Sequence, residues 1–140
     1  MVEMASLYND IKKQGISLFT YDVGDEKSVT LEIKNKYAVF IDPFQFESIS
    51  EMKRALAHEI GHCATGCTHK VSSPLDLVTK HEYEANRWAI EQYIPFEELR
   101  LAISKGYTEE WQLAEYFDFP QNFIHLTLEY YFEIKQKKIG

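Results

Sequence analysis

Two histidines and a glutamate lie within five consecutive residues, His58-Glu59-Ile60-Gly61-His62. Residues four apart on a helix lie on the same face, so the two imidazoles can bind one metal ion together. In this H-E-x-x-H arrangement the glutamate is not a ligand, and it takes a proton from a metal-bound water. The pattern predicts a hydrolytic zinc centre with His58 and His62 as ligands and Glu59 as the catalytic base. The alternative for so short a motif is an exposed amphipathic helix that carries two histidines.

A catalytic zinc site needs a third protein ligand and keeps one open position. Glu82 and Glu84 are the candidates in the next predicted helix. They lie about 200° apart around the helix axis, so only one of them can face the metal. We predict Glu82, because Asn86 follows one turn later on the same face and can hydrogen-bond a ligand as a second-shell partner. Glu84 shares its side of the helix with Trp88. A structural zinc site usually has four protein ligands, and only three can be assigned here.

The segments that must position these residues read as a helix, a small sheet and then further helices. Residues 1–14 predict the first helix, and three apolar stretches predict strands over 16–21, 29–33 and 37–41. In the second strand Val29, Leu31 and Ile33 share one face. This order of elements predicts an α+β domain with a small antiparallel sheet.

The predicted helices after the sheet carry the candidate site and a helical tail. The motif helix is expected to begin at Ser48 or Ser50 and to end near Gly66. The glutamate helix is expected over 77–93. Three more helices are expected after it: one over 96–105, one that begins at a Thr108 cap, and one over 121–137. At 140 residues the chain is expected to be a single domain, 1–140, with a helical C-terminal portion at about 95–140.

Composition excludes several classes of function. The formal net charge of −7 argues against direct nucleic-acid binding and against adhesion to anionic membranes. No stretch has the apolar length of a membrane helix, and residues 1–14 lack the apolar core of a signal peptide. We therefore expect a cytoplasmic protein in which Cys63 and Cys67 stay reduced.

Two segments together resemble the ImmA/IrrE family of metallo-endopeptidases. The first is R-A-L-A-H-E-I-G-H at 54–62, and the second is H-E-Y-E-A-N-R-W-A at 81–89, closed by Ile94-Pro95. The family pairs H-E-[LI]-G-H with a downstream helix of the form E-x-x-A-[ND]-x-[FW]-A. Its pattern also tolerates E-x-E-A-N, so the choice between Glu82 and Glu84 stays open. The helical tail is similar to that of members from phages and mobile elements of Gram-positive bacteria.

The resemblance implies a zincin-like fold with a Zn²⁺ site formed by His58, His62 and Glu82, and with Glu59 as general base. It also implies a protein substrate, a helix-turn-helix repressor whose cleavage or inactivation ends the dormancy of a phage or integrative element. The alternative is a binding module that holds a repressor with weak or no proteolysis. The oligomeric state is left open.

Two finer expectations concern the substrate. A peptide would lie as an extended strand along the sheet edge, with residues 37–41 as its partner. A second donor to the oxyanion would come from His69, His81, Tyr83 or Tyr131.

Overall fold

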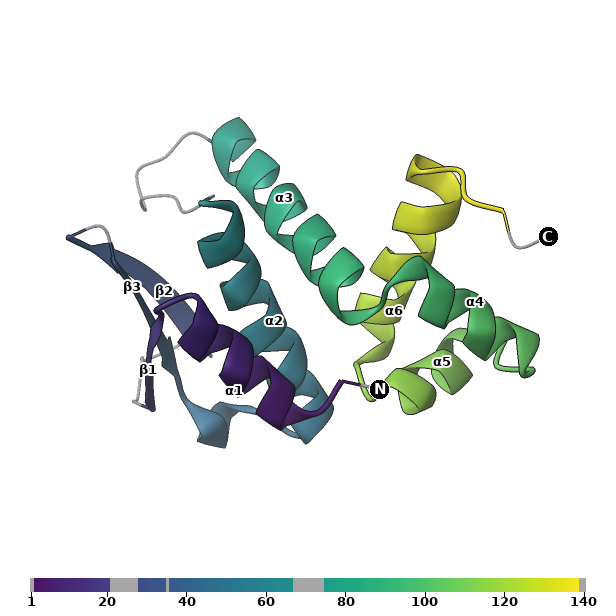
Figure 1. Ribbon diagram of the computed structural model, residues 1–140, viewed down its shortest axis with the longest axis horizontal. Coiled ribbons are helices and arrows are strands. Elements are labelled where there is room, and N and C mark those ends of the chain that lie inside the picture. The colour runs from purple at the N-terminus through teal and green to yellow at the C-terminus, as the bar shows by residue number, and fades with distance from the viewer. Residues whose placement is uncertain (1, 21–27, 35, 67–74, 139–140) are drawn as a thin grey trace.

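The computed structural model describes residues 2–20, 28–34, 36–66 and 75–138, and it confirms the α+β class (Figure 1). The first part of the chain contains helix α1, three strands, a short 3-10 turn and helix α2. The second part contains helix α3 and a set of shorter C-terminal helices. The bounds are α1 Met4–Lys13, β1 Ser17–Thr20, β2 Ser28–Ile33, β3 Lys36–Ile41, η1 Pro43–Gln45, α2 Ile49–Thr65, α3 Leu75–Tyr93, α4 Phe96–Ser104, α5 Glu110–Phe117, α6 Gln121–Leu128 and the π-helical η2 Glu129–Ile134.

The three strands form a mixed sheet in the order β1-β3-β2. The hairpin partners β2 and β3 are antiparallel, whereas β1 runs parallel to β3. The expectation of a wholly antiparallel sheet was therefore wrong for β1. It assumed that strands adjacent in sequence pair with one another, which is common but not obligatory. Here the chain passes from β1 to the far edge, and the hairpin then returns β3 into the centre.

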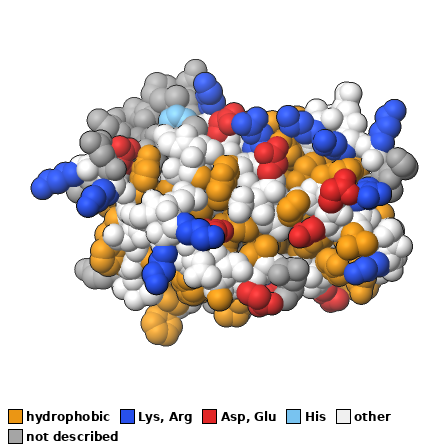
Figure 2. Space-filling model, in the orientation of Figure 1, with side chains coloured by type: hydrophobic (Ala, Val, Ile, Leu, Met, Phe, Trp, Pro, Cys, Tyr) orange, Lys and Arg blue, Asp and Glu red, His pale blue; other side chains and the backbone are white. Residues whose placement is uncertain are grey.

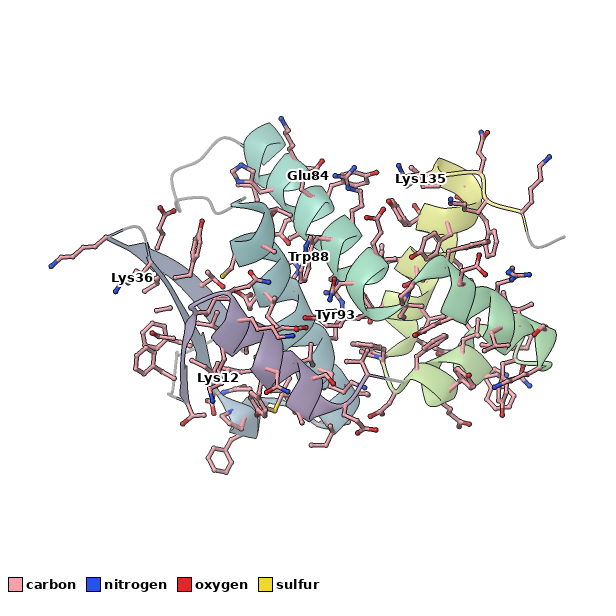
Figure 3. The ribbon with its side chains drawn as sticks, viewed as in Figure 1. Lys12, Lys36, Glu84, Trp88, Tyr93 and Lys135 are labelled. Atoms are coloured by element: carbon pink, nitrogen blue, oxygen red, sulfur yellow. The ribbon has the colours of Figure 1, made fainter. Side chains whose placement is uncertain are left out.

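One face of the sheet packs on α1 and α2, and this packing places β2 beside α2 (Figure 1). Val39 and Ile41 of β3 point to this inner face and are fully buried, together with Leu7 of α1 and Leu56 of α2. In the C-terminal half of α1, Asp10 accepts a hydrogen bond from the Tyr93 hydroxyl over 2.9 Å. Tyr93 is labelled in Figure 3 at the end of α3. The end of α3 is thereby tied to α1.

Helix α2 has the ends that the sequence predicts. Ser48 is its N-cap, and the Ser48 hydroxyl accepts a hydrogen bond from the backbone N–H of Glu51 over 3.2 Å. Gly66 closes the helix with a left-handed backbone at φ 67°, a conformation that glycine adopts without steric cost. The prediction of a Thr108 cap was off by one residue, because Glu109 is the N-cap of α5 and its backbone N–H donates to Gln112 Oε1 over 3.0 Å.

Helices α2 and α3 pack closely at Gly61, and this contact sets the distance between the histidine helix and the glutamate helix. A Cβ added at Gly61 would overlap the carbonyl oxygen of Ala85 and lie 3.1 Å from its carbonyl carbon. Both residues belong to the buried part of the interface. The glycine inside the motif is therefore required by packing of one backbone on another.

Gly61→Ala is expected to lower the free energy of unfolding by about 1–3 kcal/mol, because α3 must move to admit the methyl group. Urea unfolding of the metal-free protein measures this change. Ala64→Ser, on the exposed side of α2, is the control and should change stability by less than about 0.5 kcal/mol. Equal stability of Gly61→Ala and wild type would contradict the close approach.

The C-terminal helices are joined to α2 by a buried cation. Lys53 is 1% exposed, and its Nζ donates to the backbone carbonyl of Phe117 over 3.3 Å and lies 3.5 Å from Asp118. The same ammonium lies 4.6 Å from the centre of the Phe119 ring. Burial lowers the pKa of Lys53, and the nearby Asp118 carboxylate opposes that shift. The α5–α6 corner is thus held against the turn of α2 that precedes the histidines.

Candidate metal centre

The structure brings His58, His62 and Glu82 together from two helices. Their ligand atoms all lie within 4.8 Å of one another. The two Nε2 atoms are 3.1 Å apart, Glu82 Oε2 lies 2.8 Å from His58 Nε2, and Glu82 Oε1 lies 3.0 Å from His62 Nε2. The spacing of four residues on α2 supplies the histidine pair, and the packing of α3 supplies the carboxylate.

This donor set fits a zinc ion. Zinc bonds to histidine nitrogen and carboxylate oxygen of about 2.0–2.1 Å place tetrahedral ligand atoms about 3.3 Å apart. The three observed separations are slightly shorter, so the side chains need only a small outward movement to receive an ion. Hydrogen bonds to the two imidazoles hold the pKa of the Glu82 carboxyl well below its usual range, which keeps it ionised, as a ligand must be.

Glu84 lies elsewhere on α3. Its carboxylate forms an ion pair with Arg87 Nη2 at 2.9 Å. Glu84 and Trp88 lie one turn apart along α3, as Figure 3 shows. Of the two candidate glutamates, the described structure therefore groups only Glu82 with the histidines.

Asn86 and Arg54 form a chain of hydrogen bonds behind His58. Asn86 Oδ1 lies 3.0 Å from His58 Nδ1 and accepts a second bond from Arg54 Nη2 over 3.0 Å. A guanidinium only donates, so the atom facing it is the amide oxygen, and His58 Nδ1 must carry the proton. In the metal-free site His58 Nε2 faces Glu82 at 2.8 Å. Once Nε2 gives up its proton, the Nδ1–H tautomer held by Asn86 would present the Nε2 lone pair to a metal. The sequence analysis directed Asn86 toward Glu82, whereas its side chain contacts His58. Its second-shell role stays a prediction.

Arg54 contacts the candidate site through Asn86, and the sequence analysis did not single it out. Its guanidinium stacks 4.7 Å from the centre of the Phe123 ring of α6, and burial lowers its pKa to about 10. The signal was present, because Arg54 precedes His58 by four residues and so shares its face of α2.

Asn86→Ala is expected to weaken zinc binding about 10- to 100-fold, because His58 loses the acceptor that orients its ring. Competition with a fluorescent chelator measures the affinity. Asn86→Asp retains an acceptor oxygen at the same place and should stay close to wild type. A matching loss in both variants would mean that the acceptor oxygen alone does not suffice and that the neutral amide is required.

Glu59 belongs to the same turn of α2 but points to the sheet. Its side chain is 7% exposed, and the Thr30 hydroxyl donates to its Oε2. Ser28 Oγ lies 3.4 Å from its Oε1. The carboxylate therefore comes from the same helix turn as the histidine pair and contacts two hydroxyl groups of β2. The sequence analysis did not identify either hydroxyl residue.

A cleft of about 450 Å³ opens in front of His58 and Glu82. It is bordered by β2, α2, α3 and the start of α6, and its lining includes Ser28, Arg54, His58, Glu82, Asn86 and Asn122.

On the face shown in Figure 2, side chains of both charge signs are interspersed. No single-sign stripe marks that view as a nucleic-acid surface.

The four residues predicted as possible oxyanion donors lie in different places. The Tyr131 hydroxyl is buried and donates to the carbonyl of Ile94 over 2.8 Å, so that candidate was wrong. Tyr83 lines a different, small cavity beside α6. His69 lies outside the described residues, as does Cys67. His81 remains an untested prediction.

The comparisons with known proteins agree with this geometry. A family model of the peptidase M78 class, described as the IrrE N-terminal-like domain, matches residues 11–129. A search of curated proteins and a search of solved structures each found no match. None of the helices in the described segments is long and apolar enough to cross a membrane. The matched region covers most of the chain and contains the whole cluster of His58, His62 and Glu82. The chain therefore belongs to the peptidase M78 family of zinc metalloproteases.

Proposed function

We propose that this chain is a zinc-dependent endopeptidase that cleaves a helix-turn-helix repressor of a phage or mobile element in the cytoplasm. The observation that carries the proposal is the meeting of His58, His62 and Glu82, with the buried Glu59 on the same turn of α2 as the histidines. An open three-ligand set next to a base is the arrangement of a catalytic site, whereas a structural site is closed by a fourth ligand.

Different side chains would bind the metal, orient a ligand and transfer the proton. When bound, zinc would supply Lewis acidity toward a water molecule and a peptide carbonyl. His58, His62 and Glu82 would hold the ion, and Asn86 fixes the His58 ring. Glu59 would accept a proton from the attacking water and return it to the leaving amine.

The sheet edge beside the site is β2, and this corrects the predicted substrate strand. Residues 37–41 lie in β3, which is paired on both sides and has no free edge. Within the described sheet, β2 is the edge strand next to α2. An extended peptide would add to β2 through main-chain hydrogen bonds, which brings its backbone past Glu59 and the histidines.

A repressor substrate is supported by charge and by the family resemblance. The chain carries a net charge of −7, which favours encounter with a basic DNA-binding protein. The acidic composition also fits a protein that acts on the repressor and not on its DNA.

The test compares newly formed protein N-termini in cells that express the wild type or Glu59→Gln. We expect the wild type alone to generate a new N-terminus within a helix-turn-helix protein, and chelation of zinc during expression to suppress it. Cleavage products from proteins of other classes would refute the repressor assignment. Repressor inactivation that persists in Glu59→Gln would favour the binding module.

A further inference from the structure

The pattern of polar and apolar residues in β2 is the reverse of what a strand beside a core normally shows. Ser28 and Thr30 pair with Ile41 and Val39, which are fully buried beneath the sheet, so the two hydroxyls share this inner face. Leu31 follows Thr30 and points to the opposite, outer face, where it is 45% exposed. A strand that turns hydroxyls inward and a leucine outward gives up apolar burial, so the inward hydroxyls need a specific partner.

Glu59 is that partner. Its carboxylate is largely buried, and a buried carboxylate is costly unless donors reach it. Thr30 contacts one carboxylate oxygen and Ser28 approaches the other. In the part of the chain that the structure describes, the lysine and arginine ion pairs are with other acids. Each carboxylate oxygen has more than one lone pair, so a hydroxyl bond still leaves an acceptor site for a proton.

We propose that Thr30, assisted by Ser28, is a positioning residue that holds the Glu59 carboxylate in the orientation of a general base. This inference rests on the proposed peptidase function and adds to it residues outside both sequence motifs. Because β2 is also the proposed partner of the substrate strand, one element would align the base and the peptide relative to each other. A base held in one orientation needs no reorganisation before proton transfer.

The contact itself is tested without activity, by a double-mutant cycle in urea unfolding of the metal-free protein. The cycle combines Thr30→Val, which keeps the shape and removes the hydroxyl, with Glu59→Ala. Thr30→Val is expected to raise the unfolding equilibrium constant about 10- to 100-fold more in the presence of Glu59 than in its absence, the range for hydrogen bonds to charged groups. Thr20→Val, at an exposed position of β1, is the control and should show no coupling.

The positioning role is tested with zinc-loaded protein and a library of quenched fluorescent peptides as the probe. Thr30→Val is expected to lower kcat about 10- to 100-fold, with KM and zinc content unchanged, since a misaligned base loses part of its contribution. Thr30→Ser should recover most of kcat. Thr20→Val should match the wild type.

Each outcome decides the inference. Absence of coupling in the cycle would show that the hydroxyl does not hold Glu59. Coupling with an unchanged kcat would overturn the positioning role and leave the hydroxyls with a purely stabilising one. A zinc-loaded wild type that cleaves no peptide would contradict the peptidase function instead, and the positioning role would fall with it although the contact remained.

Discussion

Glu82→Ala is expected to abolish stoichiometric zinc binding, whereas Glu84→Ala should keep it. Glu82 contacts both imidazoles through its two oxygens, and its removal leaves two histidines alone on α2. Two protein ligands do not make the three-ligand site of a catalytic zinc. Glu84 instead pairs with Arg87, so its loss removes only a surface ion pair. Elemental analysis of purified, dialysed protein measures zinc per chain.

Glu84→Ala serves as the matched control, because it removes an acid from the same helix two residues away. Near one zinc per chain in wild type and Glu84→Ala, with little in Glu82→Ala, would establish the third ligand. The reverse pattern would move the site to Glu84 and would require α3 to rotate from its described position. A wild type that takes up no zinc after addition of the metal would refute the metal centre as a whole.

Glu59→Gln is expected to reduce kcat by at least about 100-fold while zinc content stays at the wild-type level. General base catalysis contributes about 10²- to 10⁴-fold, and an amide cannot accept the proton. The substitution preserves size and leaves His58 and His62 in place, so metal binding should persist. Initial rates of cleavage are measured on the intact repressor that the N-terminus experiment identifies. Zinc content is measured on the same enzyme preparation, so both parts of the expectation are tested.

Glu84→Gln is the corresponding control, since it makes the same chemical change outside the cluster and should keep kcat within about twofold of wild type. A fall in zinc content parallel to the fall in kcat would identify Glu59 as a ligand and not as the base. An unchanged kcat in Glu59→Gln would assign proton transfer to another group.

The residues that could be predicted from the sequence are those whose relation is local. The spacing of His58 and His62 places both on one face of a helix, whatever surrounds it. Ser48 and Gly66 mark the ends of that helix through their own backbone chemistry. The order of periodic segments likewise sufficed for the α+β class, because a helix and a strand each show their own period. The single domain over 1–140 stays a prediction.

Relations between distant segments were harder to predict, because no local period encodes them. The grouping of Glu82 with the histidines was predicted from its helix face, and the structure brings the three together, although their roles await the metal measurements. The same reasoning directed Asn86 toward Glu82, since both lie on one face of α3, but the close packing at Gly61 brings Asn86 to His58.

The sheet is the clearest example of a relation that the local sequence does not encode. Local alternation predicts that Val29, Leu31 and Ile33 share one face of the strand, but it does not say which face of the sheet is buried. That choice depends on the hairpin with β3 and on the proximity of α2, which together turn Ser28 and Thr30 toward Glu59. The strand order, the edge next to the site and the hydroxyls that hold the proposed base are consequences of long-range packing, in which free energy is gained only once the whole core has assembled.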